Sequence, residues 1–136
     1  MKWYNFLWEG LQTLLGCIVL LFLKKTNWEN TPYLYKGRRL IWFEKGKFFS
    51  GTSLGYWIML PSDAGDKTVA HEYGHCVQSS RLGIFYLPLV GIPSLINNLK
   101  ARKCKRTKEN YYNLYPEAEA DRLGGVVWRD GYRVLT

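Results

Sequence analysis

The chain of 136 residues contains two histidines, His71 and His75, which enclose Glu72, Tyr73 and Gly74 in an HExxH motif. Residues four apart share one face of an α-helix, so both imidazoles can bind the same metal ion. Neutral histidine nitrogens are good zinc ligands, and a catalytic zinc ion takes three protein ligands and leaves one position for water. Glu72 would lie beside that water as the general base. The motif therefore predicts a zinc site, with Zn2+ as the cofactor.

A chance match of two ordinary helix histidines is the alternative interpretation of so short a motif. Two further features argue against it. Gly74 lies in the middle of the expected helix, where glycine costs about 1 kcal/mol relative to alanine, so we expect a contact that excludes a side chain. A second acidic motif, Glu117-Ala118-Glu119-Ala120-Asp121, follows 42 residues after His75 and offers a third ligand.

HExxH followed by ExxAD on a later helix resembles the gluzincin metallopeptidases, specifically the Ste24/HtpX-like membrane proteases. The layout covers about Ser53 to Trp128 and is also similar to that of small, uncharacterised bacterial membrane proteins with the same motifs. The resemblance implies that Glu117 is the third zinc ligand and that Asp121 orients His71 or His75. The spacing agrees, because residues four apart share a helical face and ligating imidazoles usually donate their second N–H to a carboxylate.

The two carboxylates of the ExxAD motif also have a simpler interpretation, a solvated acidic helix start favoured by the helix dipole. Glu119 points away from the face of Glu117 and Asp121 and is expected at the surface. The chain departs from the family in having no third histidine to stabilise the tetrahedral intermediate. This role would fall to one of four residues, among which the sequence does not choose: Tyr111, Tyr112, Tyr115 or Arg122.

The N-terminal segment from Phe6 to Leu23 is the one candidate membrane span, whereas the family enzymes are larger and have several. A spanning helix needs about 20 apolar residues, and this segment reaches that length only if Glu9 and Gln12 lie in the interface. We expect a single-span anchor, with an interfacial helix as the alternative. The lysine pair after the segment places the rest of the chain in the cytoplasm. A cleavable signal peptide is disfavoured because the apolar run ends in Phe-Leu-Lys-Lys.

The formal charge of +8 is concentrated beside apolar segments, with six of the nineteen basic residues between Lys100 and Lys108. This arrangement fits an anionic membrane surface, although a solvated basic loop is an equal alternative for these residues alone. The chain has no helix-turn-helix, zinc-finger or RNP-like pattern, so no nucleic-acid partner is expected. Its three cysteines have no CxxC spacing and do not form a disulfide framework.

The order of expected elements predicts an α+β fold, a minimal zincin-like domain over residues 26–136 after a membrane anchor over residues 1–25. After a linker from Thr26 to Gly37, the expected elements are a hairpin of Arg38–Phe43 with Phe48-Phe49, a strand at Ser53–Leu60, a helix capped by Asp66 and ending at Leu82, an apolar run at Ile84–Ile96, and a helix from Glu117 to about Trp128. The strand at Ser53–Leu60 is either an edge strand that receives substrate or an ordinary buried strand. The apolar run is too short to span a membrane and is a buried helix-loop, a re-entrant piece or a membrane-touching lip.

The favoured function is a membrane-associated zinc metalloendopeptidase in which Glu72 activates water to hydrolyse a peptide or protein substrate. A site-2-type intramembrane protease is disfavoured, because Asp66, Lys67 and Arg81 flank the motif closely. The rival from another class is a non-catalytic, membrane-anchored binding protein with a structural or vestigial metal site. Glu72 favours the metallopeptidase over this non-catalytic protein, since a structural metal site has no need of a general base.

Overall fold

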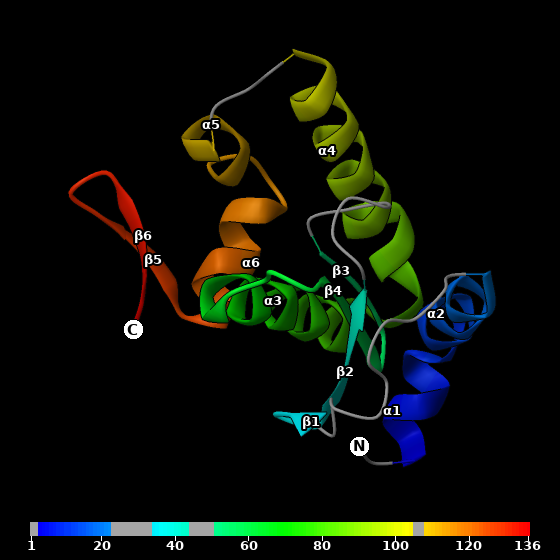
Figure 1. Cartoon of the computed structure of the whole chain (residues 1–136). Coiled ribbons are helices and arrows are strands. Elements are labelled where there is room, and N and C mark those ends of the chain that lie inside the picture. Colours follow the sequence, from blue (N-terminus) through cyan, green and yellow to red (C-terminus); the bar gives the residue numbers. More distant parts are fainter. Residues whose placement is uncertain (1–2, 23–33, 44–50, 105–107) are drawn as a thin grey trace.

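The computed structural model of the chain describes residues 3–22, 34–43, 51–104 and 108–136, and shows a mixed α+β protein in which helices surround a small sheet (Figure 1). The helices are α1 (Trp3–Trp8), α2 (Gly10–Phe22), α3 (Asp66–Leu82), α4 (Ile92–Cys104), α5 (Lys108–Tyr112) and α6 (Glu117–Gly124), with short helical turns η2 (Gly83–Phe85) and η3 (Leu87–Gly91). The strands are β1 (Leu34–Tyr35), β2 (Arg38–Phe43), β3 (Thr52–Leu54), β4 (Trp57–Pro61), β5 (Val126–Arg129) and β6 (Tyr132–Leu135).

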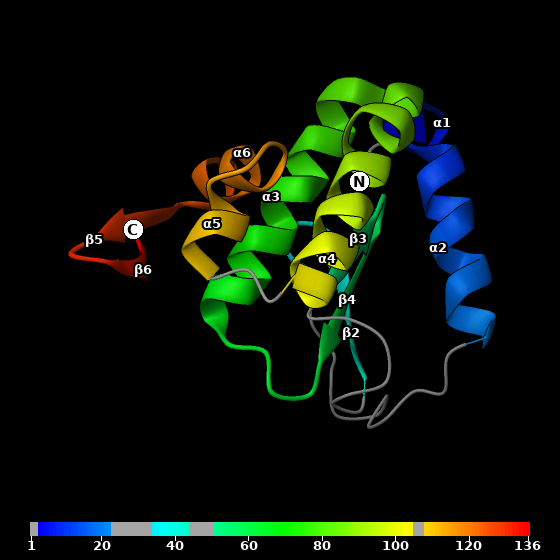
Figure 2. The same ribbon diagram turned by 90° about the horizontal axis from the view of Figure 1, so that it is seen from above.

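The main sheet has the order β1-β2-β4-β3, with β2 and β4 parallel and the other two pairs antiparallel. It lies between α3 and α2, as Figure 2 shows. Ile58 and Leu60 of β4 pack with Val69 of α3 on one face, and Met59 packs with Leu20 of α2 on the other. Because both faces of β4 are covered, its sequence is a continuous apolar run without alternation.

The N-terminal segment forms two helices with a break at Glu9, so the expectation of one continuous helix is wrong. Glu9 is fully buried and paired with Arg38 of β2 at 3.1 Å. Gln12 is also buried, and its amide donates hydrogen bonds to Ser79 Oγ and to the carbonyl of Gly83. These two residues therefore face the interior of the protein and not a membrane interface, because a buried carboxylate needs a cationic partner.

No helix among residues 3–22, 34–43, 51–104 and 108–136 has both the length and the apolarity needed to cross a membrane. Since α2 covers one face of the sheet, it belongs to the packed core. The membrane-anchoring role of residues 1–25 stays a prediction.

The expected strand at Ser53–Leu60 is a hairpin, in which β3 and β4 pair antiparallel around Gly55. Gly55 has a φ of +60°, and a Cβ there would lie 2.2 Å from Thr13 Oγ1, so the chain turns where only glycine fits. Part of the expected linker, Leu34–Gly37, is instead β1 and its turn to β2. Phe48 and Phe49, the expected partner strand of β2, lie outside the described residues, as do residues 26–33.

The prediction of a helix over Asp66–Leu82 that stops at Gly83 is confirmed. The residue that caps it is Gly65 and not Asp66, whose carboxylate lies in the first turn, where the helix dipole favours it. The following apolar run continues as η2, η3 and the start of α4.

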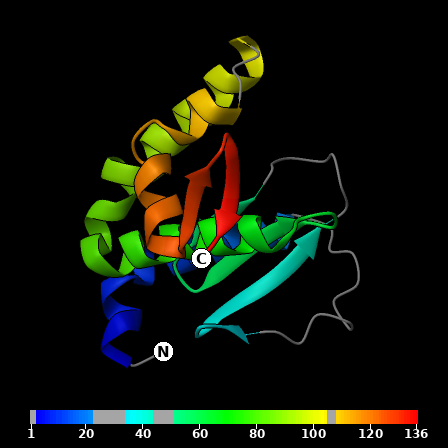
Figure 3. The same ribbon diagram turned by 90° about the vertical axis from the view of Figure 1, so that its left-hand side faces the viewer.

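The last predicted helix is shorter than expected. α6 ends at Gly124, because Gly125 adopts a left-handed conformation with a φ of 84°. The chain then forms the β5–β6 hairpin beside α6 (Figure 3). Asp130 and Gly131 make the turn with φ values of 51° and 80°. An Asp-Gly pair between apolar runs is a strong hairpin signal, so this hairpin was predictable.

Candidate metal centre

Two glycines allow α3 and α6 to cross in direct contact. A Cβ on Gly74 would lie 1.9 Å from the carbonyl oxygen of Ala120, and a Cβ on Gly124 would lie 1.9 Å from that of Ala70. The contact expected at Gly74 is therefore present. It brings the HExxH and ExxAD motifs together at one end of a cavity.

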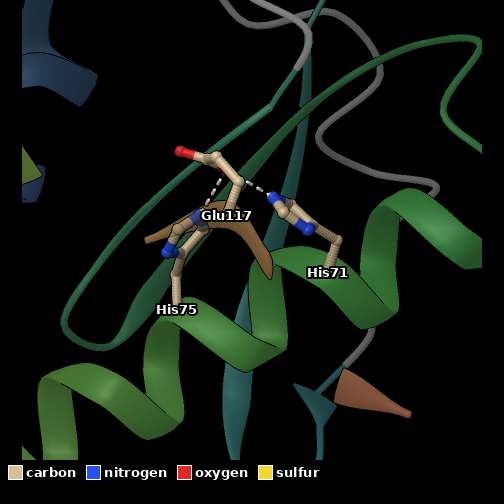
Figure 4. Close-up of side chains that lie close together, drawn as sticks. All are labelled: His71, His75 and Glu117. Carbon is tan, nitrogen blue, oxygen red and sulfur yellow. Dashed lines mark hydrogen bonds and ion pairs between the residues drawn. The ribbon is translucent and has the colours of Figure 1, made fainter. Parts of the chain in front are cut away.

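His71, His75 and Glu117 meet at this crossing, as Figure 4 shows. Glu117 Oε2 lies 3.0 Å from His71 Nε2 and 3.2 Å from His75 Nε2. The potential ligand atoms of the three residues all lie within 4.8 Å of one another, and all three side chains are buried. The spacing of the two motifs in the sequence thus corresponds to one cluster in space.

The second ring nitrogen of each histidine donates a hydrogen bond to a fixed acceptor. His71 Nδ1 donates to Asp121 Oδ1 at 2.7 Å, so Asp121 orients His71, a choice that the sequence left open. His75 Nδ1 donates to Gln78 Oε1 at 2.8 Å. Both Nε2 atoms are thereby directed to the same point, which is the usual arrangement around a ligated metal.

Gln78 is a site residue that the sequence analysis missed, although it lies three residues after His75 on the same helical face. Its amide nitrogen donates to the carbonyl of Pro116 at 3.2 Å and to Glu119 Oε2 at 2.8 Å. These bonds turn its oxygen toward His75. Glu119 thus helps to orient a candidate ligand, and the expectation of a plain surface residue is wrong.

Ser94 is the second residue that the sequence did not reveal. Its hydroxyl donates to Glu117 Oε1 at 2.5 Å. One oxygen of Glu117 is therefore held by Ser94, while the other faces the histidines. No motif marks Ser94 in the sequence.

Arg133 of β6 is the third missed residue, because the hairpin that carries it was not predicted. Its Nε donates to Asp121 Oδ2 at 3.0 Å and its Nη2 to Oδ1 at 2.5 Å. The guanidinium also lies 3.5 Å above the ring centroid of Tyr112. Tyr112 in turn meets the ring of His71 edge-on, with 5.1 Å between centroids. Arg133 thus contacts both Asp121 and Tyr112, two side chains that lie against His71.

The carboxylates around His71 raise its pKa to about 9. Burial alone would lower this pKa, but the hydrogen bonds to Asp121 and Glu117 outweigh it. Burial would likewise raise the pKa of Glu117, yet the hydrogen bonds from His71 and His75 hold it well below its usual range. Both shifts have the same cause, since a charged imidazole and a charged carboxylate stabilise each other across the hydrogen bond between His71 and Glu117.

Glu72 lies beside the candidate ligands and lines the cavity. Burial raises its pKa, against the opposing effect of His75 and His71. Its Oε2 is buried and has no hydrogen-bond partner among the described residues. A buried carboxylate oxygen without a partner is uncommon, and a catalytic role or a bound water or ion is the usual explanation.

The cavity next to the cluster has a volume of about 580 Å³, and most of the surface of its lining is apolar. Of the four candidate stabilisers, Tyr111 and Tyr112 line it. Tyr115 is exposed and donates to the carbonyl of Leu89, while Arg122 is exposed and pairs with Glu119 at 3.6 Å. The structure therefore brings two of the four to the site and keeps the other two away.

Both cavity tyrosines are neutral hydrogen-bond donors at physiological pH. Burial is the main cause that raises the pKa of Tyr111, followed by the charge of Glu117. Burial also raises the pKa of Tyr112, although Arg133 opposes this. Gly51 and β3, a strand at one edge of the sheet, also line the cavity, and a Cβ on Gly51 would lie 2.7 Å from Glu72 Oε1.

Comparison of the chain with protein-family models, with curated proteins and with solved structures found no match.

Proposed function

We propose that the protein is a zinc-dependent metallopeptidase of the gluzincin type. The observation that carries this proposal is the convergence of His71, His75 and Glu117 on one point, with Glu72 beside them in the same cavity. Two neutral imidazoles and one carboxylate are the ligand set of several catalytic zinc sites. A set of three ligands leaves a position for water.

The partners of the ligands support a metal ion at this point. The Nδ1 atom of each of the two histidines already donates a hydrogen bond, so only the Nε2 atoms remain to bind a metal ion. The unpaired Oε2 of Glu72 adds an acceptor that lacks a donor within the described chain. A metal-associated water would supply that donor.

A zinc ion bound there would lower the pKa of a water molecule and polarise the scissile carbonyl. Glu72 would accept the proton of this water and transfer it to the leaving amine nitrogen. Burial raises the pKa of this carboxyl above its usual value, in the direction that favours a general acid–base role.

Two further features of the cavity fit a peptide substrate. The phenol of Tyr111 or Tyr112 would donate a hydrogen bond to the oxygen of the attacked carbonyl, in place of the absent third histidine. The edge strand β3 would receive the substrate backbone as an added strand.

Metal content tests the proposal on the full chain, purified in detergent. We expect near-stoichiometric zinc by mass spectrometry in the wild type and in Glu72→Gln. We expect its loss in His75→Ala and Glu117→Ala but not in Asp130→Ala, which changes an exposed acid in the β5–β6 turn. Absence of zinc from the wild type, even after incubation with the metal, would exclude the proposed centre.

Hydrolysis of a peptide library, followed by mass spectrometry, tests the catalytic part. The wild type should cleave peptides of the library. Glu72→Gln should cleave them at least about a hundredfold more slowly, since general acid–base catalysis contributes at least that factor. Zinc binding without cleavage of any peptide would favour the non-catalytic binding protein with a structural metal.

A further inference from the structure

Exposed large apolar side chains are gathered on two segments of the molecule. Of the 22 such residues within the described chain, ten lie on α1 and α2 and seven between Gly83 and Leu99. The first group is Trp3, Tyr4, Leu7, Trp8, Leu11, Leu14, Leu15, Ile18, Leu21 and Phe22, and the second is Ile84, Phe85, Leu89, Ile92, Leu95, Ile96 and Leu99. This clustering exceeds the scattered apolar exposure of an ordinary water-facing surface.

The polar side chains of α2 lie on its inner face, and not on its outer face as in an ordinary surface helix. Gln12 and Thr13 lie on its buried face, together with Gly16 and Leu20. Its outer face carries only apolar residues, such as Leu14 and Leu21. A helix at a water surface has its polar residues outside and its apolar stripe inside, so the outer face of α2 is suited to an apolar environment.

Charge is absent from both outer faces, and two lysines follow directly after the second. Glu9 is the one charged residue in Trp3–Phe22 and is fully buried, and the stretch Gly83–Leu99 contains none. Lys100 and Lys103, both exposed, follow directly on α4. Apolar helix faces bordered by lysines and by exposed tryptophans match the layers of a bilayer, with acyl chains beside anionic headgroups.

The two faces meet at the cavity of the candidate metal centre. Leu15 of α2 and Leu95 and Leu99 of α4 belong to the exposed apolar groups and also line the cavity. Figures 1 and 2 both place α2 and the β5–β6 hairpin at opposite ends of the molecule. The exposed side chains that line the cavity all belong to these two apolar faces, so the cavity opens between them.

We propose that the outer faces of α1–α2 and of Gly83–Leu99 form one docking surface for an anionic bilayer, with the mouth of the cavity turned toward the lipid. A substrate of the centre then enters from the bilayer surface. Docking needs neither zinc nor hydrolysis, so it can be tested apart from the proposed activity.

The test is flotation of the full chain with vesicles after removal of detergent. We expect the wild type to float with vesicles of phosphatidylcholine and phosphatidylglycerol, and less with phosphatidylcholine alone. Leu14→Glu and Ile96→Glu should each bind the vesicles at least about tenfold more weakly than the wild type, because each loses the burial of one large side chain.

Matched control variants exist outside the docking surface. Leu34 is 57% exposed against 59% for Leu14, and Leu135 is 48% exposed against 44% for Ile96. Leu34→Glu and Leu135→Glu should float like the wild type. Docking through these faces is refuted if all four variants float equally. It is also refuted if the wild type stays at the bottom of the gradient and forms a dimer without detergent.

The direction of the cavity mouth has its own readout. An environment-sensitive fluorophore on Asn98→Cys, which lines the cavity, should shift to shorter wavelength on addition of vesicles. The same label on Asp130→Cys should not shift. Cys17 and Cys104 are replaced by serine in both proteins. A shift in emission for the label on Asp130→Cys alone would show that the protein docks in the opposite orientation.

Discussion

Asp121 has two kinds of partner, since it accepts a hydrogen bond from His71 and two from Arg133. Removing the guanidinium would free Asp121 to turn away from the imidazole. We expect Arg133→Met to weaken zinc binding about 10- to 100-fold, the usual effect of losing an outer partner of a ligand. Competition with a chromophoric chelator measures this affinity.

Arg129→Met is the matched control, because Arg129 lies on the same hairpin but is exposed. Its zinc affinity should equal that of the wild type. Thermal unfolding of the metal-free proteins checks that both variants fold. Equal weakening by the two substitutions would mean that the hairpin itself, and not Arg133, supports the centre.

The proton on His71 predicts how the metal-free protein responds to pH. Its pKa is raised from 6.5 to about 9 in the folded chain, so its contribution to stability is complete below pH 6.5 and disappears as the pH rises through about 9. Zinc must displace this proton, so zinc affinity should rise over the same interval.

Thermal unfolding of chelator-treated protein across this interval measures the effect. Asp121→Asn, which removes one of the carboxylates that raise this pKa, should flatten the dependence. A melting temperature of the wild type that increases from pH 6.5 to 9 would contradict the assignment.

The candidate ligands could be recognised in the sequence because the spacing within each motif is a local property of one helix. His71, His75 and Glu117 all meet in one buried cluster. Ser94 and Arg133 could not be predicted, since their roles depend on contacts between separate elements. Ser94, for example, contacts a residue 23 positions later in the chain.

At the scale of elements, the contact of α3 with α6 leads to a prediction about Gly74. Alanine is the better helix former by about 1 kcal/mol, yet its methyl group would lie 1.9 Å from the backbone of Ala120. We expect Gly74→Ala to lower the free energy of unfolding by about 1–3 kcal/mol, the usual cost of overpacking. Chemical denaturation of the zinc-loaded protein measures it.

Gly10→Ala is the control for this change, because a Cβ at Gly10 meets nothing within 4 Å. Its free energy of unfolding should stay within about 0.5 kcal/mol of the wild type. A Gly74→Ala protein as stable as the wild type would mean that α6 can move away from α3 without loss.

The elements themselves were predictable where glycine residues clearly marked their ends. α3 begins and ends as expected, because Gly65 and Gly83 bound it. The β3–β4 hairpin was not predicted, since β4 is covered on both faces and shows no alternation. The break at Glu9 depends on a partner, Arg38, that lies 29 residues away.

At the scale of the whole molecule, α2 joins the two parts that the sequence analysis separated. Its inner face packs on Met59, Ile41 and Phe43 of the sheet, and its outer face is apolar and exposed. One helix thus belongs both to the protein core and to the proposed lipid contact.

A consequence concerns attempts to obtain a soluble fragment. Deleting residues 1–25 would uncover one face of the sheet and remove Glu9, the buried carboxylate that pairs with Arg38, and removing one partner of a buried ion pair costs about 3–5 kcal/mol. We expect the shortened chain to aggregate or to lack zinc. Size-exclusion chromatography and metal analysis check this. A monomeric, zinc-binding fragment would show that the segment can be removed. Otherwise biochemistry on this protein requires that residues 1–25 be kept.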